Sequence, residues 1–322
     1  MKRLLLAGAA VVFMPAVATA QSAVTFDGTV SLGFSMSNVD LDPIGDFDLS
    51  GMTLELDTDI GLTDAFSVGL DFGLSANTVD VAGTDIDIDL MSLAIEPVYQ
   101  FGNGAYAGVY YRMGDLDLSI GDIFGPINIG VDTESYGLFG GYEDGPIWVE
   151  AFIGTSDGEP EIPGGGIDIM DYGIAASYDI NPDFDVFGSI LRTDIDAGGA
   201  DLALTAYSIG ADYGFGNGLA VYGSVGLLDI DLGPLGDFDA TGMTLGMSYD
   251  LSGMGSVPVV LNAEYSRTTV DLGGLGIDPE IDRFALGVTI PLGGGSSQPL
   301  NTNTGTARGD YRSAIAALVQ SF

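Results

Sequence analysis

The sequence predicts an all-β fold: a transmembrane antiparallel up-and-down β-barrel of about fourteen strands, with twelve or sixteen also compatible with the pattern. Three observations carry this prediction. An export signal opens the chain, apolar residues alternate with polar or small ones in many segments, and short and long connections alternate between those segments. No apolar run in the mature chain reaches about 18 residues, so a transmembrane helix is not expected.

The first twenty residues have the layout of a secretory signal peptide. Lys2 and Arg3 give a positive start, residues 4–17 are mostly apolar, and small residues occupy positions 18–20. The apolar stretch is too short to span a bilayer, so we expect cleavage before Gln21 and not a retained anchor. The chain then divides into a signal peptide (1–20), a barrel (21–292), and a flexible linker with a short helical tail (293–322).

The composition combines acidity with hydrophobicity. The chain has 46 acidic and 8 basic residues, a net charge of −38, and yet 46% of its residues are hydrophobic. This combination indicates that one protein serves two environments. Its 50 Gly and 14 Tyr are typical of an all-β barrel or sandwich built from short segments. Because the chain has no Cys, disulfides do not stabilise the fold.

Strict two-residue alternation marks the strands. In residues 66–75 every second position is apolar, and the pattern recurs in residues 243–250, 257–266 and 283–292. Because successive strand side chains point to opposite faces, each segment has one apolar face and one polar or small face. About ten residues are enough for a tilted strand to cross a bilayer.

The connections between these segments are of two alternating kinds. Short turns lie near 61–64, 102–104, 143–145, 181–182, 216–218 and 253. Longer, acidic, Gly-rich connections lie near 38–50, 77–85, 114–131, 155–170, 193–201, 229–241 and 270–282. Short periplasmic turns and longer outer loops are typical of a bacterial outer-membrane barrel, whereas a β-sandwich has no reason to sort its loops in this way.

Internal repeats predict the strand number. Residues 43–54 recur as residues 234–245 with nine of twelve positions identical, and residues 101–104 recur as residues 215–218. The offsets, 191 and 114 residues, correspond to ten and six strands, or about nineteen residues per strand with its connection. About fourteen such units fit the mature chain up to Leu292, and an even number brings both ends of the barrel to the periplasm.

Aromatic residues gather beside the predicted short turns. They are Tyr99, Phe101, Tyr106, Tyr142, Trp148, Tyr178, Phe184, Tyr213, Phe215 and Tyr249. Rings at one end of every strand would form a girdle at a membrane–water boundary. A soluble, secreted acidic β protein, which alternation alone leaves open, would not sort its aromatic residues by turn type.

With these features the chain resembles Gram-negative porins, particularly the acidic porins of alphaproteobacteria, over residues 1–292. The resemblance rests on the signal peptide, the alternation, the loop layout and the strand ending at residues 284–292, and not on a short motif. It implies the cell outer membrane as location, outer-membrane lipid and lipopolysaccharide as neighbours, and a homo-oligomer as one form of assembly. One departure is that porins usually end on an aromatic residue of the last strand, whereas here residues 293–322 follow it.

The residue inventory argues against an enzyme. The chain has no His and no Cys, and its one Lys, Lys2, lies in the signal peptide. Catalysis based on His, Cys or Lys is therefore absent, which leaves only carboxylate chemistry of the glycosidase kind. The low content of basic residues also makes nucleic acid an unsuitable partner, because phosphate binding needs Lys and Arg.

Strand parity assigns charged side chains to the lumen. If the more apolar face meets lipid, the inward residues are Glu55, Asp57, Asp71, Glu96, Arg112, Glu134, Glu150, Asp185, Asp212, Glu264 and Arg283. An acidic lumen with a few Arg attracts cations and repels anions, because a low-dielectric wall focuses the field. Alternatively, these charges only keep the lumen wet.

We therefore expect a porin-like channel for passive diffusion of small hydrophilic solutes that prefers cations. Two rivals stay open: a structural or surface-interaction barrel that does not conduct, and an importer of hydrophobic compounds. The porin predicts ohmic conductance, and the structural rival predicts a lumen closed by side chains.

The third long connection, which begins at Gly114, is a candidate constriction. The third outer loop of porins often folds inward, so the resemblance implies that Asp115, Asp117 and Asp122 narrow the pore opposite Arg112. Alternatively, this segment extends the strands above the membrane. The remaining pore candidates are Glu96, Glu150, Glu264 and Arg283.

Two acidic clusters are candidates for Ca²⁺, which prefers six to eight oxygen ligands. The first comprises Asp40, Asp42, Asp46 and Asp48, and its repeat comprises Asp229, Asp231, Asp237 and Asp239. Neither has the spacing of an EF-hand, so solvated acidic loops are the default interpretation. Ca²⁺ is the only cofactor that the sequence suggests.

The C-terminal segment begins as a linker rich in Gly, Ser, Asn and Thr, and residues 311–320 have the composition of a short helix. We expect the barrel to close at Leu292 and the tail to lie in the periplasm. A sharper alternative is that the tail enters the acidic lumen, led by Arg308 and Arg312, and acts as a plug.

Overall fold

The computed structural model describes residues 24–41, 45–81, 84–120, 127–159, 167–197, 201–231, 233, 236–254, 258–271, 279–293, 302–314 and 317. The strands are β1 (Thr25–Leu41), β2 (Gly45–Thr63), β3 (Phe66–Val81), β4 (Thr84–Gln100), β5 (Ala105–Ile120), β6 (Ile127–Asp144), β7 (Ile147–Glu159), β8 (Ile167–Asn181), β9 (Phe184–Ala197), β10 (Asp201–Gly214), β11 (Leu219–Asp231), β12 (Asp237–Asp250), β13 (Val260–Asp271) and β14 (Glu280–Leu292). A short 3₁₀ turn, η3 (Ser252–Met254), follows β12.

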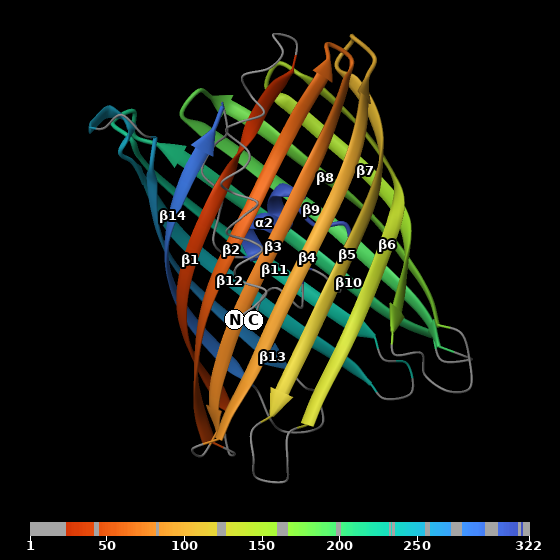
Figure 1. Cartoon of the computed structure of the whole chain (residues 1–322), viewed down its shortest axis with the longest axis vertical. Coiled ribbons are helices and arrows are strands. Elements are labelled where there is room, and N and C mark those ends of the chain that lie inside the picture. The colour runs from red at the N-terminus through yellow and green to blue at the C-terminus, as the bar shows by residue number, and fades with distance from the viewer. Residues whose placement is uncertain are drawn as a thin grey trace.

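These fourteen strands form one closed antiparallel barrel (Figure 1). Each strand pairs with its neighbours in sequence, and β1 pairs with β14 from Gly28 opposite Leu292 to Asp40 opposite Glu280. Closure leaves no unpaired sheet edge, which is the condition for a β-structure to lie in lipid. The predicted fold class and the strand number are confirmed.

The two faces of the wall have different chemistry. Large apolar side chains point outward and are exposed, for example Phe34 at 55% and Leu245 at 64%. Along β14, Phe284 and Leu286 are exposed on the outside, whereas the alternate residue Arg283 is buried inside. An apolar band outside and polar or small residues inside is the arrangement of a transmembrane barrel.

The strands are longer than the sequence pattern suggests, at the expense of the acidic connections. β2 alone has 19 residues. Asp40 pairs in register with Asp46, and Asp229 with Asp239. The connections predicted at 38–50 and 229–241 therefore include strand ends, because the Asp residues in them alternate with apolar ones and the backbone ladder continues.

Neither acidic cluster is assembled into a metal site in the described residues. No three carboxylate, His or Cys side chains within them converge as ligands. Asp48 instead accepts a hydrogen bond from the Asn38 amide across the β1–β2 pair at 3.3 Å. Asp42 lies outside the described residues.

Aromatic residues lie beside the short turns as predicted, but two of them face the lumen and not the membrane. On the outer face, Tyr99 meets Phe101 edge-on with ring centroids 5.2 Å apart, and Tyr213 meets Phe215 at 4.9 Å. These exposed rings suit a girdle at the membrane boundary. Tyr106 and Trp148 lie instead on the inner face, by strand alternation, and Tyr106 donates a hydrogen bond there to Glu150.

The described part of the C-terminal tail, residues 302–314 and 317, lies inside the barrel (Figure 1). Its helix α2 (Thr302–Arg308) packs against β8, β9, β10, β11 and β12. The expected place in the periplasm is therefore wrong, and the alternative of entry into the lumen is confirmed. Helix α2 lies in a stretch that was predicted to be a linker. The helix predicted at residues 311–320 is represented by one helical hydrogen bond, from Ala317 N to Ser313 O at 3.1 Å. No helix in the described residues is long and apolar enough to cross a membrane.

Candidate functional site

The inner wall of the barrel is acidic. Alternation within the strand registers places these carboxylates on the inner face: Glu55, Asp57, Asp71, Glu96, Glu150, Asp171, Asp185, Asp212 and Glu264. Among the described strand residues, Arg112 and Arg283 are the basic side chains on this face. The wall therefore carries a clear excess of negative charge.

Three residues that were predicted to reach the lumen, Glu134 by strand parity and Asp115 and Asp117 by an inward-folded loop, lie on the outer face instead. Glu134 lies on β6 at the parity of Tyr136 and Leu138, which are exposed on the outside. Asp115 and Asp117 lie within β5 at the parity of the exposed Met113.

The third connection does not fold inward over the residues of it that are described. β5 runs unbroken to Ile120 and pairs with β4 and β6, so Asp115 and Asp117 do not face Arg112. The strand continues because its Asp and Leu residues alternate. Asp122, the third residue of the predicted constriction, lies outside the described residues.

Arg112 forms an ion pair on the inner wall with a residue of the neighbouring strand. Its Nη2 lies 2.8 Å from Glu96 Oε1, and its Nε donates to the same oxygen at 3.3 Å. The same Nη2 lies 3.9 Å from Asp71 Oδ2 and donates to the backbone oxygen of Asp310 at 3.1 Å. Two predicted pore residues, Glu96 and Arg112, are thus brought together, and both lie beside the C-terminal segment.

The guanidinium of Arg312 contacts four side chains of the inner wall that we call the guanidinium site: Glu96, Glu150, Phe139 and Phe152. Nη1 donates to Glu150 Oε1 and Nη2 donates to Glu96 Oε2 at 3.3 Å. The guanidinium carbon lies 4.6 Å from the ring centre of Phe139 and 5.5 Å from that of Phe152. The Arg312 side chain is 9% exposed and that of Glu150 is 6% exposed, so this ion pair is buried.

The charge of Arg312 is retained at this site. Burial alone would lower its pKa, but the nearby carboxylates of Glu96 and Glu150 outweigh burial and raise the pKa above its usual value. The guanidinium is therefore a permanent cation within the lumen.

Further bonds hold the C-terminal segment, residues 302–314 and 317, which we call the lumen segment. Arg308 lies 3.4 Å from Asp212 and 4.5 Å from the ring centre of Phe187. Hydroxyl groups of β9 and β11 add hydrogen bonds to the segment: Ser189 to the Thr306 oxygen, Ser224 with Thr304 at 3.0 Å, Thr193 with Ser313 at 3.5 Å, and Ala314 N to Thr193 Oγ1 at 3.1 Å.

The lumen segment thus contacts opposite parts of the wall. Arg312 is bonded to β4 and β7, and Arg308 to β10. In the ring of fourteen strands β4 lies six positions from β10 and β7 lies three, so the segment reaches from β10 to the wall nearly opposite it at β4.

Two other predicted pore residues lie elsewhere on the inner wall. Glu264 on β13 accepts a hydrogen bond from Tyr222 OH at 2.7 Å, and Arg283 is on the neighbouring β14. Both side chains are buried. They are not part of the guanidinium site.

Sequence reasoning missed several residues that matter inside the barrel. Asp171 is buried and accepts hydrogen bonds from Ser156 and Thr193, both at 2.5 Å. Phe139 and Phe152 were missed because large apolar residues are not expected on a polar inner face. Their parity, opposite to that of the outward Leu138 and Ile153, was the available signal.

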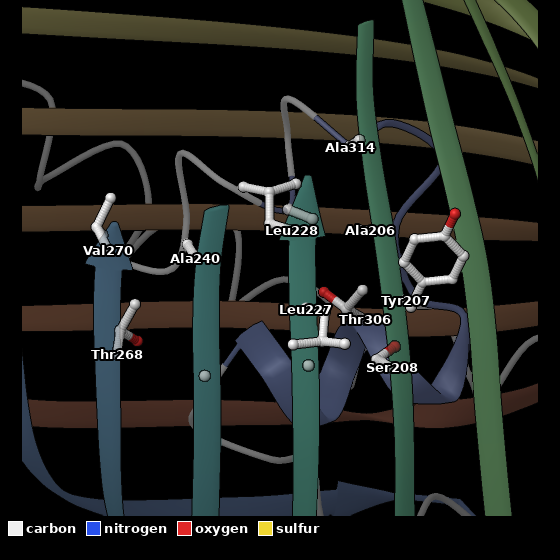
Figure 2. A pocket seen from close by; sticks show the side chains of 13 residues that line it. Ala206, Tyr207, Ser208, Leu227, Leu228, Ala240, Thr268, Val270, Thr306 and Ala314 are labelled. Atoms are coloured by element: carbon white, nitrogen blue, oxygen red, sulfur yellow. The ribbon is translucent and has the colours of Figure 1, made fainter. Parts of the chain in front are cut away.

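A small pocket lies on the other side of the lumen segment (Figure 2). Thr306 and Ala314 of the segment face Ala206, Leu228 and Ala240 of the wall. The side chains around this pocket are mostly small or apolar, in contrast to the acidic and aromatic guanidinium site.

A closed antiparallel barrel with an apolar outer band and a charged lumen defines an outer-membrane β-barrel of the channel class. Comparison with known proteins then identifies the family. A family model described as Gram-negative porin matches residues 98–273, more than half of the chain, and the protein belongs to this family. No curated protein matches the sequence.

Solved structures share the architecture at low sequence identity. The anion-selective porin from Comamonas acidovorans aligns with a TM-score of 0.53 and 15% identity over 84% of this chain and 100% of that one. A Pseudomonas aeruginosa FadL homologue gives 0.51 and 13% over 82% and 90%. The trimer form of OmpT from Vibrio cholerae gives 0.50 and 13% over 84% and 100%. At such identities the likeness shows the fold alone.

Proposed function

We propose that this porin is a channel for passive diffusion of small hydrophilic solutes and that it prefers cations. The observation that carries the proposal is the acidic inner wall, on which carboxylates such as Glu55, Asp57 and Asp71 outnumber Arg112 and Arg283. A low-dielectric wall focuses this negative potential, which raises the local concentration of cations and lowers that of anions. The anion-selective porin of Comamonas acidovorans shares the fold but supplies no argument about ion sign.

We also propose that the lumen segment acts as a plug that reduces conductance. It lies across the lumen and brings Arg308 and Arg312 into the acidic space, with Asp310 between them, so that its formal charge is 2 − 1 = +1. Its removal should widen the path and restore the full negative charge of the wall. Larger and more cation-selective currents are the expected consequence.

A non-conducting structural barrel is the second candidate. The observation in its favour is the same segment, which is bonded to opposite parts of the wall. An importer of hydrophobic compounds is supported only by the apolar pocket beside the segment (Figure 2).

The test is single-channel conductance in planar bilayers, with reversal potential under a potassium chloride gradient. The full mature chain is compared with a variant that lacks residues 294–322, and folding of both is checked by heat-modifiable gel migration. Cation-selective steps that grow on deletion support channel and plug. Unchanged conductance overturns the plug, an anion-selective reversal overturns the cation preference, and silence of both folded proteins favours the structural barrel.

Three further predictions from the sequence remain proposals. They are cleavage of the signal peptide before Gln21, loose Ca²⁺ bridging between outer acidic residues and lipopolysaccharide, and assembly into a homo-oligomer. The similar OmpT structure is described as a trimer, which makes that state the first to test.

A further inference from the structure

We propose that the guanidinium site binds small guanidinium-bearing cations that enter the lumen, and that Arg312 is a tethered ligand which fills the site in their absence. The proposal rests on the proposed channel function, because a solute must enter the lumen to reach the site. It adds a chemical class of solute that an acidic lumen alone would not select.

The geometry fits a planar guanidinium better than an ammonium group. Glu150 and Glu96 come from different strands and each accepts from a different terminal nitrogen of Arg312. Both Phe139 and Phe152 lie within reach of the guanidinium carbon for a cation–π contact. A guanidinium supplies several N–H donors in one plane and a weakly hydrated face for stacking, whereas an ammonium is a compact and strongly hydrated point charge.

The wall supplies a partner for each carboxylate of this site. Arg112 fixes Glu96 through a 2.8 Å contact, and Tyr106 OH donates to Glu150 Oε2 at 3.0 Å. Phe152 packs edge-on against Tyr110 with ring centroids 6.4 Å apart. Because all these partners belong to the barrel, departure of Arg312 leaves a preorganised site and not a collapsed one.

Without Arg312, the guanidinium site would contain a buried carboxylate that lacks a counter-charge, so it would favour binding of another cation. Glu96 keeps its ion pair with Arg112, but Glu150 would retain only the neutral hydroxyl of Tyr106 among the partners described above. A carboxylate enclosed by protein without a counter-charge is strongly destabilised. Water that enters recovers part of this loss, but it replaces neither the charge nor the contact with the two rings.

Because Arg312 is tethered to the barrel, its side chain and a free guanidinium compete for the same site. Arg312 is part of the same chain, so it competes with free solute at an effective concentration on the order of millimolar. A free guanidinium must exceed this concentration in the natural protein. It should bind more tightly to a variant in which the side chain of residue 312 is removed.

The Arg308 position offers an internal comparison. Its guanidinium has one carboxylate, Asp212, at 3.4 Å and one ring, Phe187, at 4.5 Å. Both members of this pair are more exposed than Arg312 and Glu150. The site with two carboxylates and two rings is therefore the selective one.

The experiment uses folded protein in detergent micelles and n-butylguanidinium as the probe, with n-butylammonium as the matched cation. Trp148 is the single Trp of the chain and lies on the inner face of β7, two residues before Glu150, so its fluorescence reports binding. We expect Arg312→Ala to bind n-butylguanidinium at least tenfold more tightly than the natural chain does. The same variant should prefer n-butylguanidinium to n-butylammonium by at least tenfold.

Two controls locate the site. Adding Glu150→Gln to Arg312→Ala should abolish the preference, whereas Arg192→Ala, which removes an outer-face pair with Asp194, should behave as the natural chain. Equal affinity of Arg312→Ala for both cations overturns the proposal, and so does absence of binding to folded Arg312→Ala. If Arg312→Ala does not fold, Ser313→Cys in the otherwise natural chain provides the test: n-butylguanidinium, and not n-butylammonium, must accelerate labelling of the thiol.

Binding in micelles does not require conduction, so the two proposals can fail separately. Silence in bilayers with selective binding in micelles overturns the channel and leaves the site. Conductance without selective binding leaves the channel and overturns the site.

Discussion

Replacing Arg312 with Ala should release the lumen segment from the wall. The guanidinium of Arg312 is bonded to Glu150 and Glu96 and stacks near two rings, and the pair with Glu150 is buried. Loss of the cation leaves the Glu150 carboxylate without an opposite charge. The docked state therefore loses the contacts of Arg312, and the buried negative charge of Glu150 is no longer neutralised by a cation.

The size of the effect follows from this arrangement. Breaking a buried ion pair by removal of one partner costs about 3–5 kcal/mol. The partial access of solvent to Glu96 places the expected loss at the lower end, about 3 kcal/mol. Since about 1.4 kcal/mol corresponds to a tenfold change in an equilibrium constant, the undocked population should rise roughly a hundredfold.

The absence of Cys from the chain provides the assay. Ser313→Cys places one thiol in the lumen segment at a position that is 8% exposed. When docking and undocking are fast relative to labelling, the labelling rate is proportional to the undocked population. Arg312→Ala in this background should accelerate labelling roughly a hundredfold, up to the rate of a free thiol.

Arg192→Ala is the matched control. It also removes an arginine–carboxylate ion pair, that of Arg192 with Asp194 at 2.8 Å, but this pair lies on the outer face. It should leave the labelling rate unchanged. Acceleration by less than tenfold in folded Arg312→Ala would refute the reasoning. The lumen segment would then be held by its hydroxyl and backbone hydrogen bonds and not by the buried charge.

Three other perturbations test separate parts of the structure. Gly309→Ala places a side chain at a φ of +88° and should also undock the segment, at a cost of about 1–2 kcal/mol, seen as larger single-channel currents. Asp115→Asn combined with Asp117→Asn should leave the reversal potential unchanged, because both residues face outward; a shift would restore the predicted constriction. Tyr222→Phe removes the donor to buried Glu264 and should lower the free energy of unfolding by about 1–3 kcal/mol in urea titrations in lipid, with an unchanged midpoint as the contrary result.

The fold could be predicted because its physics is local. Successive residues of a strand in the barrel wall face lipid and lumen in turn. Residues 284–292 therefore show apolar alternation in their own sequence, whatever strands pair with them. The aromatic residues and the repeat of residues 43–54 at 234–245 added the turn positions and the strand spacing. These features predicted the fourteen strands.

The errors at Glu134 and at the two Asp residues have different origins. Glu134 was assigned by hydrophobicity in a stretch where the outer face is itself partly polar, and Asp115 and Asp117 were assigned because the third loop was expected to fold inward as in porins. The register of the neighbouring strands decides the face there, and register is a property of pairs.

The candidate site was visible only in part. Glu96, Glu150 and Arg112 were predicted to face the lumen, and Arg308 and Arg312 were noted as complementary charges in the tail. Their meeting joins residues that are 216 positions apart for Arg312 with Glu96 and 162 apart for Arg312 with Glu150. The opposite charges of the tail and the lumen indicated that the two attract each other, but they did not indicate where in the lumen each Arg would bind.

The sequence by itself therefore determined the barrel and the acidity of its lumen and limited the strand number to about fourteen, because alternation and charge act residue by residue. Only the tertiary structure decided that the tail lies inside and that Arg312 sits between two carboxylates and two rings. That outcome depends on how closure of β1 on β14 sets the width of the lumen and on which inner side chains then face one another across it. These are relations between distant strands, and no local pattern encodes them.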